Sequence, residues 1–306
     1  AGFGVLSVLS MARATITLDL TSKYASFCPM THMFARIYTL PFVFVAMLGL
    51  HAAPAFAHEV WLEPQTYQVS AGQDVDIRIR NGQRLSGISL PWFQRNIGAV
   101  AVLENGTPRP ITGRLGDDPA IRLAQPAPGL AVVGYRSAGD TITYTEAAKF
   151  AAFAEEKDLG DLAQAHAARG LPEAGFQERY WRYAKTYVAV APMGDVAPDF
   201  DAGFGYETEF FLRTNPYQDA AAAPVIDVAL RYRDQPRTEA QIEVFAKAPD
   251  GTVTVERLRT DAQGHAQLSA QRGYMYLLDA VVMRPLPGDE GPVWESLWAS
   301  ATFLVP

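Results

Sequence analysis

Short segments of alternating polar and apolar residues, separated by turn signals, dominate this chain. Residues 74–80 read Asp-Val-Asp-Ile-Arg-Ile-Arg, between the turn signals Ala71-Gly72 and Asn81-Gly82. A period of two is typical of a strand with one solvent-facing side. Residues 98–103 form an apolar run that ends at Asn105-Gly106, a strong hairpin signal. Because turns recur about every ten residues, this half of the chain is expected to form a β-sandwich.

One stretch departs from this pattern. Residues 145–169 are rich in Ala, Glu, Lys and Leu, and apolar side chains recur at helical spacing on both sides of a glycine. This predicts two short amphipathic helices. Positive charges then follow at intervals of three residues, at Arg179, Arg182 and Lys185, which suits one face of a helix. We therefore expect a helical insertion over residues 145–185, a lid or brace at one end of the sandwich.

The last part of the chain reads as a second all-β module. Apolar strand segments occur at residues 225–232, 240–246, 252–258, 274–283 and 298–305, and turn signals separate the first four. Residues 219–223 resemble a short linker. The predicted fold is mostly β, with two β-sandwich domains of Ig-like or transthyretin-like type: residues 58–218, which carry the helical insertion, and residues 224–306.

The N-terminal region carries the features of an export signal. Ala55-Phe56-Ala57 has the small residues of a signal-peptidase site, preceded by Arg36 and the apolar run of residues 37–50. That run is too short to cross a bilayer, which takes about 20 apolar residues. We expect a signal peptide over residues 33–57 with cleavage after Ala57, an over-called upstream segment over residues 1–32, and a periplasmic mature protein without a transmembrane segment.

Cleavage at this point would change the composition of the chain. Its one cysteine, Cys28, would be lost, so disulfides and thiolate metal sites are not expected. Lys plus Arg falls from 26 to 23 and Asp plus Glu from 33 to 32, which gives a net charge of −9 for residues 58–306. An acidic chain of this kind argues against nucleic acid as a partner.

Cleavage after Ala57 would also make His58 the first residue. Its free α-amine and imidazole could chelate one divalent ion, and Cu(II) and Ni(II) favour such nitrogen donors. His166 on the predicted helix is a candidate second ligand. Asp279 is a candidate oxygen ligand, because it interrupts an apolar strand and a buried carboxylate needs a partner. The alternative is that His58 is only a remnant of signal-peptide cleavage and that the neighbouring apolar residues simply pack.

Several stretches, taken in order, resemble one family of exported bacterial proteins. These are His58 to Pro64, Lys149-Phe150, Glu178 to Lys185, Gly205 to Tyr217 and Trp294 to Phe303. They are similar to the family described as the periplasmic component of a nickel or cobalt transport system, domain of unknown function 4198. The resemblance implies a periplasmic location, a role in nickel or cobalt uptake, and an envelope transporter or receptor as partner. The second module also looks like transthyretin-like or carboxypeptidase-regulatory sandwiches, through residues 260–264 and Gly273-Tyr274.

Signatures of catalysis are missing from the sequence. No G-x-S-x-G segment occurs, and Gly203-Phe204-Gly205 lacks the rest of a phosphate loop. We therefore expect a non-catalytic, periplasmic protein that binds nickel, cobalt or copper, with no organic cofactor. The alternatives are a metal-free interaction or structural module of the envelope and, third, a carbohydrate-active or copper-dependent enzyme. The aromatic and basic residues 179–185 leave two interpretations open, a sugar or anion platform and, more strongly, core packing with ion pairs.

Overall fold

A computed structural model of the chain describes residues 58–104, 106–197, 199–218, 224–288 and 290–306. The expected upstream segment 1–32, signal peptide 33–57 and linker 219–223 lie outside the described residues. The described part is built from packed β-sheets with two short α-helices, which confirms the predicted fold class. Neither helix has the length and hydropathy that crossing a bilayer requires.

The largest sheet has ten strands. Along its main path the order is β15 (Val253–Arg259), β14 (Gln241–Lys247), β17 (Met275–Pro285), β18 (Pro292–Leu304), β10 (Phe176–Ala191), β8 (Gly129–Ser137), β5 (Ile97–Glu104) and β6 (Thr107–Pro110). Two further strands, β2 (Gln68–Ser70) and β9 (Asp140–Tyr144), pair with β10. β10 and β18 run parallel at the centre, so strands from both predicted domains share one sheet.

Two four-stranded sheets cover the large sheet. One contains β1 (Glu59–Pro64), β3 (Val75–Gln83), β4 (Ser86–Leu90) and β7 (Ile121–Leu123). The other contains β11 (Thr208–Leu212), β12 (Val225–Tyr232), β13 (Gln235–Pro236) and β16 (His265–Ser269). In β10, Val188 and Val190 pack into the core beneath the first sheet, whereas Tyr187 packs into the core of the second. Because alternate residues of a strand point to opposite faces, the two sheets cover opposite faces of β10.

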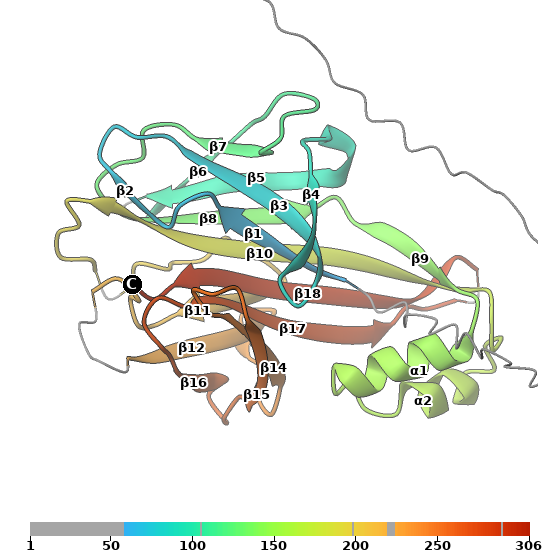
Figure 1. Ribbon diagram of the computed structural model, residues 1–306. Coiled ribbons are helices and arrows are strands. Elements are labelled where there is room, and N and C mark those ends of the chain that lie inside the picture. Colours follow the sequence, from blue (N-terminus) through green and yellow to red (C-terminus); the bar gives the residue numbers. More distant parts are fainter. Residues whose placement is uncertain (1–57, 105, 198, 219–223, 289) are drawn as a thin grey trace, which may run out of the picture. The chain divides into compact units, whose positions relative to one another are not determined.

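The helices α1 (Ala147–Glu156) and α2 (Leu162–Ala168) lie beside one end of the long strands β10, β17 and β18 (Figure 1). Phe150 and Leu162 pack there with Phe176 and Trp294. The two predicted helices and their position at one end are confirmed.

The prediction that residues 179–185 continue the helical insertion is wrong, because they belong to β10. Charges three residues apart suit a helix face, but in a strand they fall on opposite sides. Arg179 and Lys185 accordingly face one way, towards Glu295 and Asp201, and Arg182 faces the other. The β-branched and aromatic residues around them, such as Thr186, Tyr187 and Val188, fit the pleated sheet that β18 supports.

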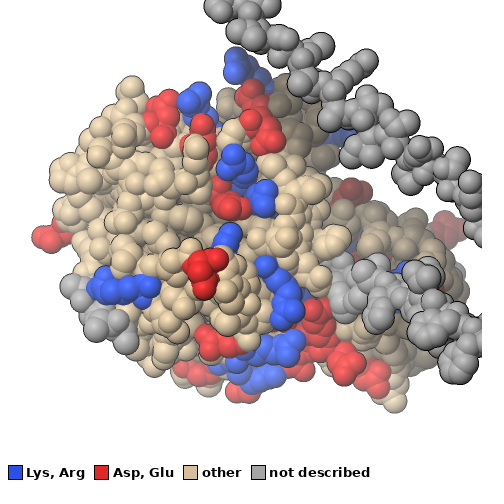
Figure 2. Space-filling model, in the orientation of Figure 1, with Lys and Arg blue, Asp and Glu red and all other residues tan. Residues whose placement is uncertain are grey.

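Charges of both signs are interspersed on the face of the molecule that Figure 2 shows. Figure 2 shows Lys and Arg side chains beside Asp and Glu side chains on the face in view, without a broad field of either sign. The face in view therefore lacks the basic stripe that is typical of nucleic-acid-binding proteins.

Candidate functional site

A cleft of about 450 Å³ opens beside the first half of β10. Its walls come from β1, β3, β4, the short 3₁₀ helix Gln94–Asn96, β8, β9 and β10. The lining residues are His58, Val60, Asn81, Leu90, Asn96, Tyr135, Ser137, Gly139, Asp140, Ile142, Glu178, Tyr180 and Arg182. Apolar walls with a few polar groups, at this size, are typical of small-molecule sites.

The cleft follows from the way β8 and β9 share one edge of β10. β9 pairs with Phe176–Tyr180 and β8 pairs with Tyr187–Val190, so neither strand covers the residues between these segments. The chain turns from β8 to β9 at Gly139, whose φ of 81° lies in the left-handed region that favours glycine. A Cβ at Gly139 would also meet the Trp181 ring at 3.0 Å. Ser137 Oγ accepts hydrogen bonds from the N–H of Gly139 and of Arg182 and joins the turn to β10.

Arg182 is the most unusual residue of this lining. Its side chain lies between two rings, with Cζ 3.9 Å from the Trp298 ring centroid and 5.0 Å from that of Tyr180. The residue is 8% exposed, and its Nε and Nη1 have no hydrogen-bond partner. It forms no ion pair with any carboxylate of the described residues. Burial lowers the pKa of Arg182, although Asp279 and Glu178 oppose this effect from a distance.

Glu178 lies four residues before Arg182 on the same face of β10 and is also buried. Its carboxylate accepts hydrogen bonds from Tyr144 Oη, at 2.8 Å, and from Ser296 Oγ. Trp298 Nε1 in turn donates to Ser296 Oγ at 2.9 Å. Burial raises the pKa of Glu178 despite these donors, which favours its neutral form. Glu178 therefore accepts hydrogen bonds from Tyr144 and Ser296 and forms no ion pair with Arg182.

The three predicted metal ligands lie in different surroundings. His58 is exposed and lines the cleft. His166 is buried in α2, where Nε2 lies 2.8 Å from the Pro172 carbonyl oxygen and Nδ1 accepts a hydrogen bond from Trp294 Nε1 at 2.9 Å. Because Nδ1 is an acceptor, Nε2 carries the proton and donates to Pro172, so both ring nitrogens have partners.

Asp279, the third predicted ligand, belongs to a buried ionic cluster around Lys157. Lys157 Nζ lies 3.0 Å from Asp279 Oδ2, 3.2 Å from Glu59 Oε1 and 2.5 Å from Glu243 Oε2. The ammonium also lies 5.0 Å from the Trp298 ring centroid. Burial lowers the pKa of Lys157, but the three carboxylates outweigh this and raise it above the ordinary value.

This cluster contains the set of acidic side chains that comes nearest to a metal-binding arrangement. Within the described residues, Glu59, Glu243 and Asp279 offer ligand atoms within 4.8 Å of one another, and neither histidine belongs to the set. Lys157 already supplies the positive charge at their centre. The arrangement fixes the end of α1 onto β1, β14 and β17, three elements that are remote in sequence.

A second buried cation, Lys185, has a similar environment on the other face of β10. Its Nζ lies 2.6 Å from Asp201 Oδ1 and 2.9 Å from Glu209 Oε1, and it donates to the Phe210 carbonyl oxygen at 2.8 Å. Tyr187 Oη donates to the other oxygen of Asp201. Lys185 thus holds β11 and the loop before it against β10.

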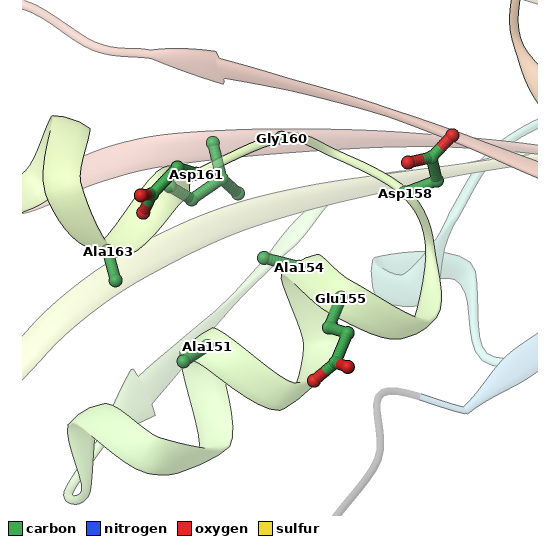
Figure 3. Close-up of a pocket in the computed structure, with 8 residues that line it drawn as sticks. Ala151, Ala154, Glu155, Asp158, Gly160, Asp161 and Ala163 are labelled. Carbon is green, nitrogen blue, oxygen red and sulfur yellow. The ribbon is translucent and has the colours of Figure 1, made fainter.

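A shallower hollow of about 340 Å³ lies between α1 and α2. It contains three carboxylates, but Figure 3 shows Glu155, Asp158 and Asp161 pointing away from one another. Asp161 accepts a hydrogen bond from the Gln164 N–H and caps α2, while Asp158 pairs with Arg259. Two of the three acids thus have structural partners, so the hollow does not bring free carboxylates together.

These groups could be predicted from the sequence only in part. A strand carboxylate at Asp279 needs a partner if buried, and Lys157 is that partner. Nothing in the sequence around Lys157 distinguishes it from a surface lysine. Glu178 and Arg182 lie in a segment whose composition suited an anion platform, but the helical interpretation placed Arg182 on the wrong face.

Comparison with known proteins identifies the family. A tetra-tandem repeat in the extending region of a large adhesion protein, a crystal structure, matches 81% of this chain at 11% identity and a TM-score of 0.19. The chain spans about half, 49%, of the length of that structure. No curated protein matches the chain. The family model described as "Domain of unknown function (DUF4198)" matches residues 55–284, so the chain belongs to this family.

Proposed function

We propose that this protein is an exported, non-catalytic binding protein that captures a divalent ion (nickel, cobalt or copper) at the cleft and acts as an accessory to its uptake in the periplasm. The observation that carries the proposal is the position of His58. The residue expected to begin the mature chain is exposed and lines the cleft beside β10. An envelope transporter or receptor is the proposed partner.

The chemistry of this position suits a borderline metal ion. A free α-amine and the imidazole of His58 would supply two nitrogen donors, and Cu(II) and Ni(II) favour nitrogen-rich sites. Asp140, which lines the same cleft, could add a carboxylate oxygen. His166 and Asp279 would first have to give up their present hydrogen bonds. The proposed ligand set therefore consists of His58 with residues of the cleft.

The polar groups of the cleft support binding rather than catalysis. Ser137 is the one serine among the lining residues, and its Oγ accepts two backbone N–H bonds, with no hydrogen bond to a carboxylate or imidazole of the described residues. A serine nucleophile needs a base within hydrogen-bond reach.

The test begins with mass spectrometry of the exported protein, to show that the chain starts at His58. Ni(II) and Cu(II) are then titrated into the wild type, His58→Ala and His265→Ala by calorimetry. His265 lies on β16 and does not line the cleft, so it is the matched control. We expect one high-affinity ion in the wild type and the control, and a loss of at least about tenfold in His58→Ala, because one ligand is removed.

Equal binding by all three proteins, or a mature chain that starts elsewhere, would remove His58 from the proposal. Absence of binding in the wild type would instead favour the metal-free interaction module of the envelope.

A further inference from the structure

We infer that Arg182 forms an anion subsite in the wall of the cleft, and that the cleft takes a small organic monocarboxylate with an apolar or aromatic body. This inference rests on the proposed function only in placing ligand binding in the same cleft. It does not require a metal ion.

The first argument is the charge balance of the buried cations. Lys157 has three carboxylates within 3.2 Å, and Lys185 has two within 2.9 Å. Arg182 is buried to a similar extent and has no carboxylate partner among the described residues. A buried charge without a partner costs several kcal/mol, so proteins rarely keep one that has no role. An anionic ligand would supply the missing charge.

The second argument is how Arg182 is held. The Trp298 and Tyr180 rings flank the guanidinium, and the Arg182 backbone is fixed by Ser137. Glu178, an acid on the same face of β10, already accepts two hydrogen bonds, and burial favours its neutral form. Arg182 is therefore rigid and is not neutralised by Glu178, which suits a group prepared for an external oxyanion.

The lining of the cleft favours one class of anion. Val60, Leu90 and Ile142 supply apolar surface, and Tyr135 and Tyr180 supply aromatic rings. One arginine matches the single charge of a carboxylate. A phosphate carries more negative charge and would meet repulsion from Asp140 in the same lining. Asn81 Oδ1, which is buried and has no partner, could accept a hydrogen bond from a ligand hydroxyl or amide.

The experiment compares benzoate with its neutral analogue benzyl alcohol. Both are titrated into the metal-free mature protein at low ionic strength, and binding is followed by calorimetry and by tryptophan fluorescence, since Trp298 contacts Arg182. In the wild type we expect benzoate to bind at least about tenfold more tightly than benzyl alcohol, the size of one charge-assisted hydrogen bond. Inorganic phosphate should bind more weakly than benzoate.

Three variants locate the effect. Arg182→Gln should remove the preference for benzoate. Arg179→Gln is the matched control, because Arg179 lies on the opposite face of β10 and pairs with Glu295. Asn81→Asp adds a negative charge to the cleft without changing Arg182, so it should weaken benzoate about tenfold and affect neutral benzyl alcohol much less. This variant tests the inference even if Arg182→Gln does not fold.

Each result decides the inference. Equal affinity for benzoate and benzyl alcohol in the wild type, an unchanged preference in folded Arg182→Gln, or phosphate binding as tight as benzoate would overturn it. Because the titration contains no metal, its failure leaves the His58 experiment intact. A negative His58 experiment likewise leaves the carboxylate result intact.

Discussion

Lys157 Nζ donates a hydrogen bond to Asp279 Oδ2 at 3.0 Å, although 122 residues separate the two in sequence. Through this contact the end of α1 is fixed to a central strand of the large sheet. Glu59 and Glu243 accept hydrogen bonds from the same ammonium, so Lys157 also joins β1 and β14 to this point.

Replacing Lys157 by Met should lower the free energy of unfolding by about 3–5 kcal/mol, because three buried carboxylates would lose their cation. Urea denaturation measures the change. Lys149→Met is the control, since Lys149 forms an exposed pair with Glu146 in the same helix. An exposed pair contributes about 0–1 kcal/mol. Similar losses in the two variants would show that the cluster does not stabilise the fold.

Glu59 should make stability depend on pH. Burial raises the pKa of Glu59 from 4.5 to about 7, while Lys157 draws it down. The folded protein therefore holds this proton more tightly than the unfolded chain. The resulting stabilisation is full below about pH 4.5 and is lost as the pH rises through about 7, at about 1.4 kcal/mol for each unit of pKa shift.

Urea denaturation of wild type and Glu59→Gln at pH 4.5, 6 and 7.5 tests this expectation. The difference between the two proteins isolates the single carboxyl group, because the other titrating groups are common to both. The stability of the wild type should fall relative to the variant as the pH rises. A constant difference across this range would contradict the shifted pKa.

The strands could be predicted from sequence where they have one buried and one exposed face. β3 alternates buried residues such as Val75 and Ile77 with half-buried charges such as Asp76 and Arg78, so its period of two was visible. The turn signals placed the β5–β6 hairpin for the same local reason. Local pattern was enough for these elements because one face of each contacts solvent.

β10 shows where local pattern fails. Both of its faces are covered, so charged residues such as Arg182 and Lys185 are buried. Their spacing of three residues matched that of a helix face and led to the wrong prediction. The partners that make this burial tolerable come from distant segments, Asp201 and Glu209 for Lys185 and the Trp298 ring for Arg182. Single-sequence patterns contain no information on such pairings. The cleft arises because β8 and β9 pair with different segments of β10, which is also a long-range pairing, so it could not be predicted from the sequence.

Thr302 should be important for the attachment of β1. Its Oγ1 donates to the Leu62 carbonyl oxygen at 2.6 Å, and Ser300 makes the equivalent bond to Val60. Thr302→Val keeps the side-chain volume but leaves a buried carbonyl without a donor, so we expect a loss of about 1–3 kcal/mol in urea denaturation. Thr254→Val, on the exposed side of the edge strand β15, should change stability by less than about 0.5 kcal/mol. Equal effects would argue that the hydroxyl bonds to β1 contribute little.

His166 distinguishes a structural from a metal-binding role within one variant. In His166→Phe, the tilted ring contact with Phe176, whose centroid lies 4.1 Å from that of His166, can persist, but Trp294 Nε1 and the Pro172 carbonyl oxygen lose their partner. The free energy of unfolding should therefore fall by about 1–3 kcal/mol. Ni(II) affinity, measured by calorimetry at a temperature below the unfolding transition, should stay within twofold of the wild type. Both ring nitrogens of His166 already have hydrogen-bond partners within the protein and are not free to bind an ion. A tenfold loss of Ni(II) affinity with unchanged stability would reverse this assignment and place His166 among the metal ligands.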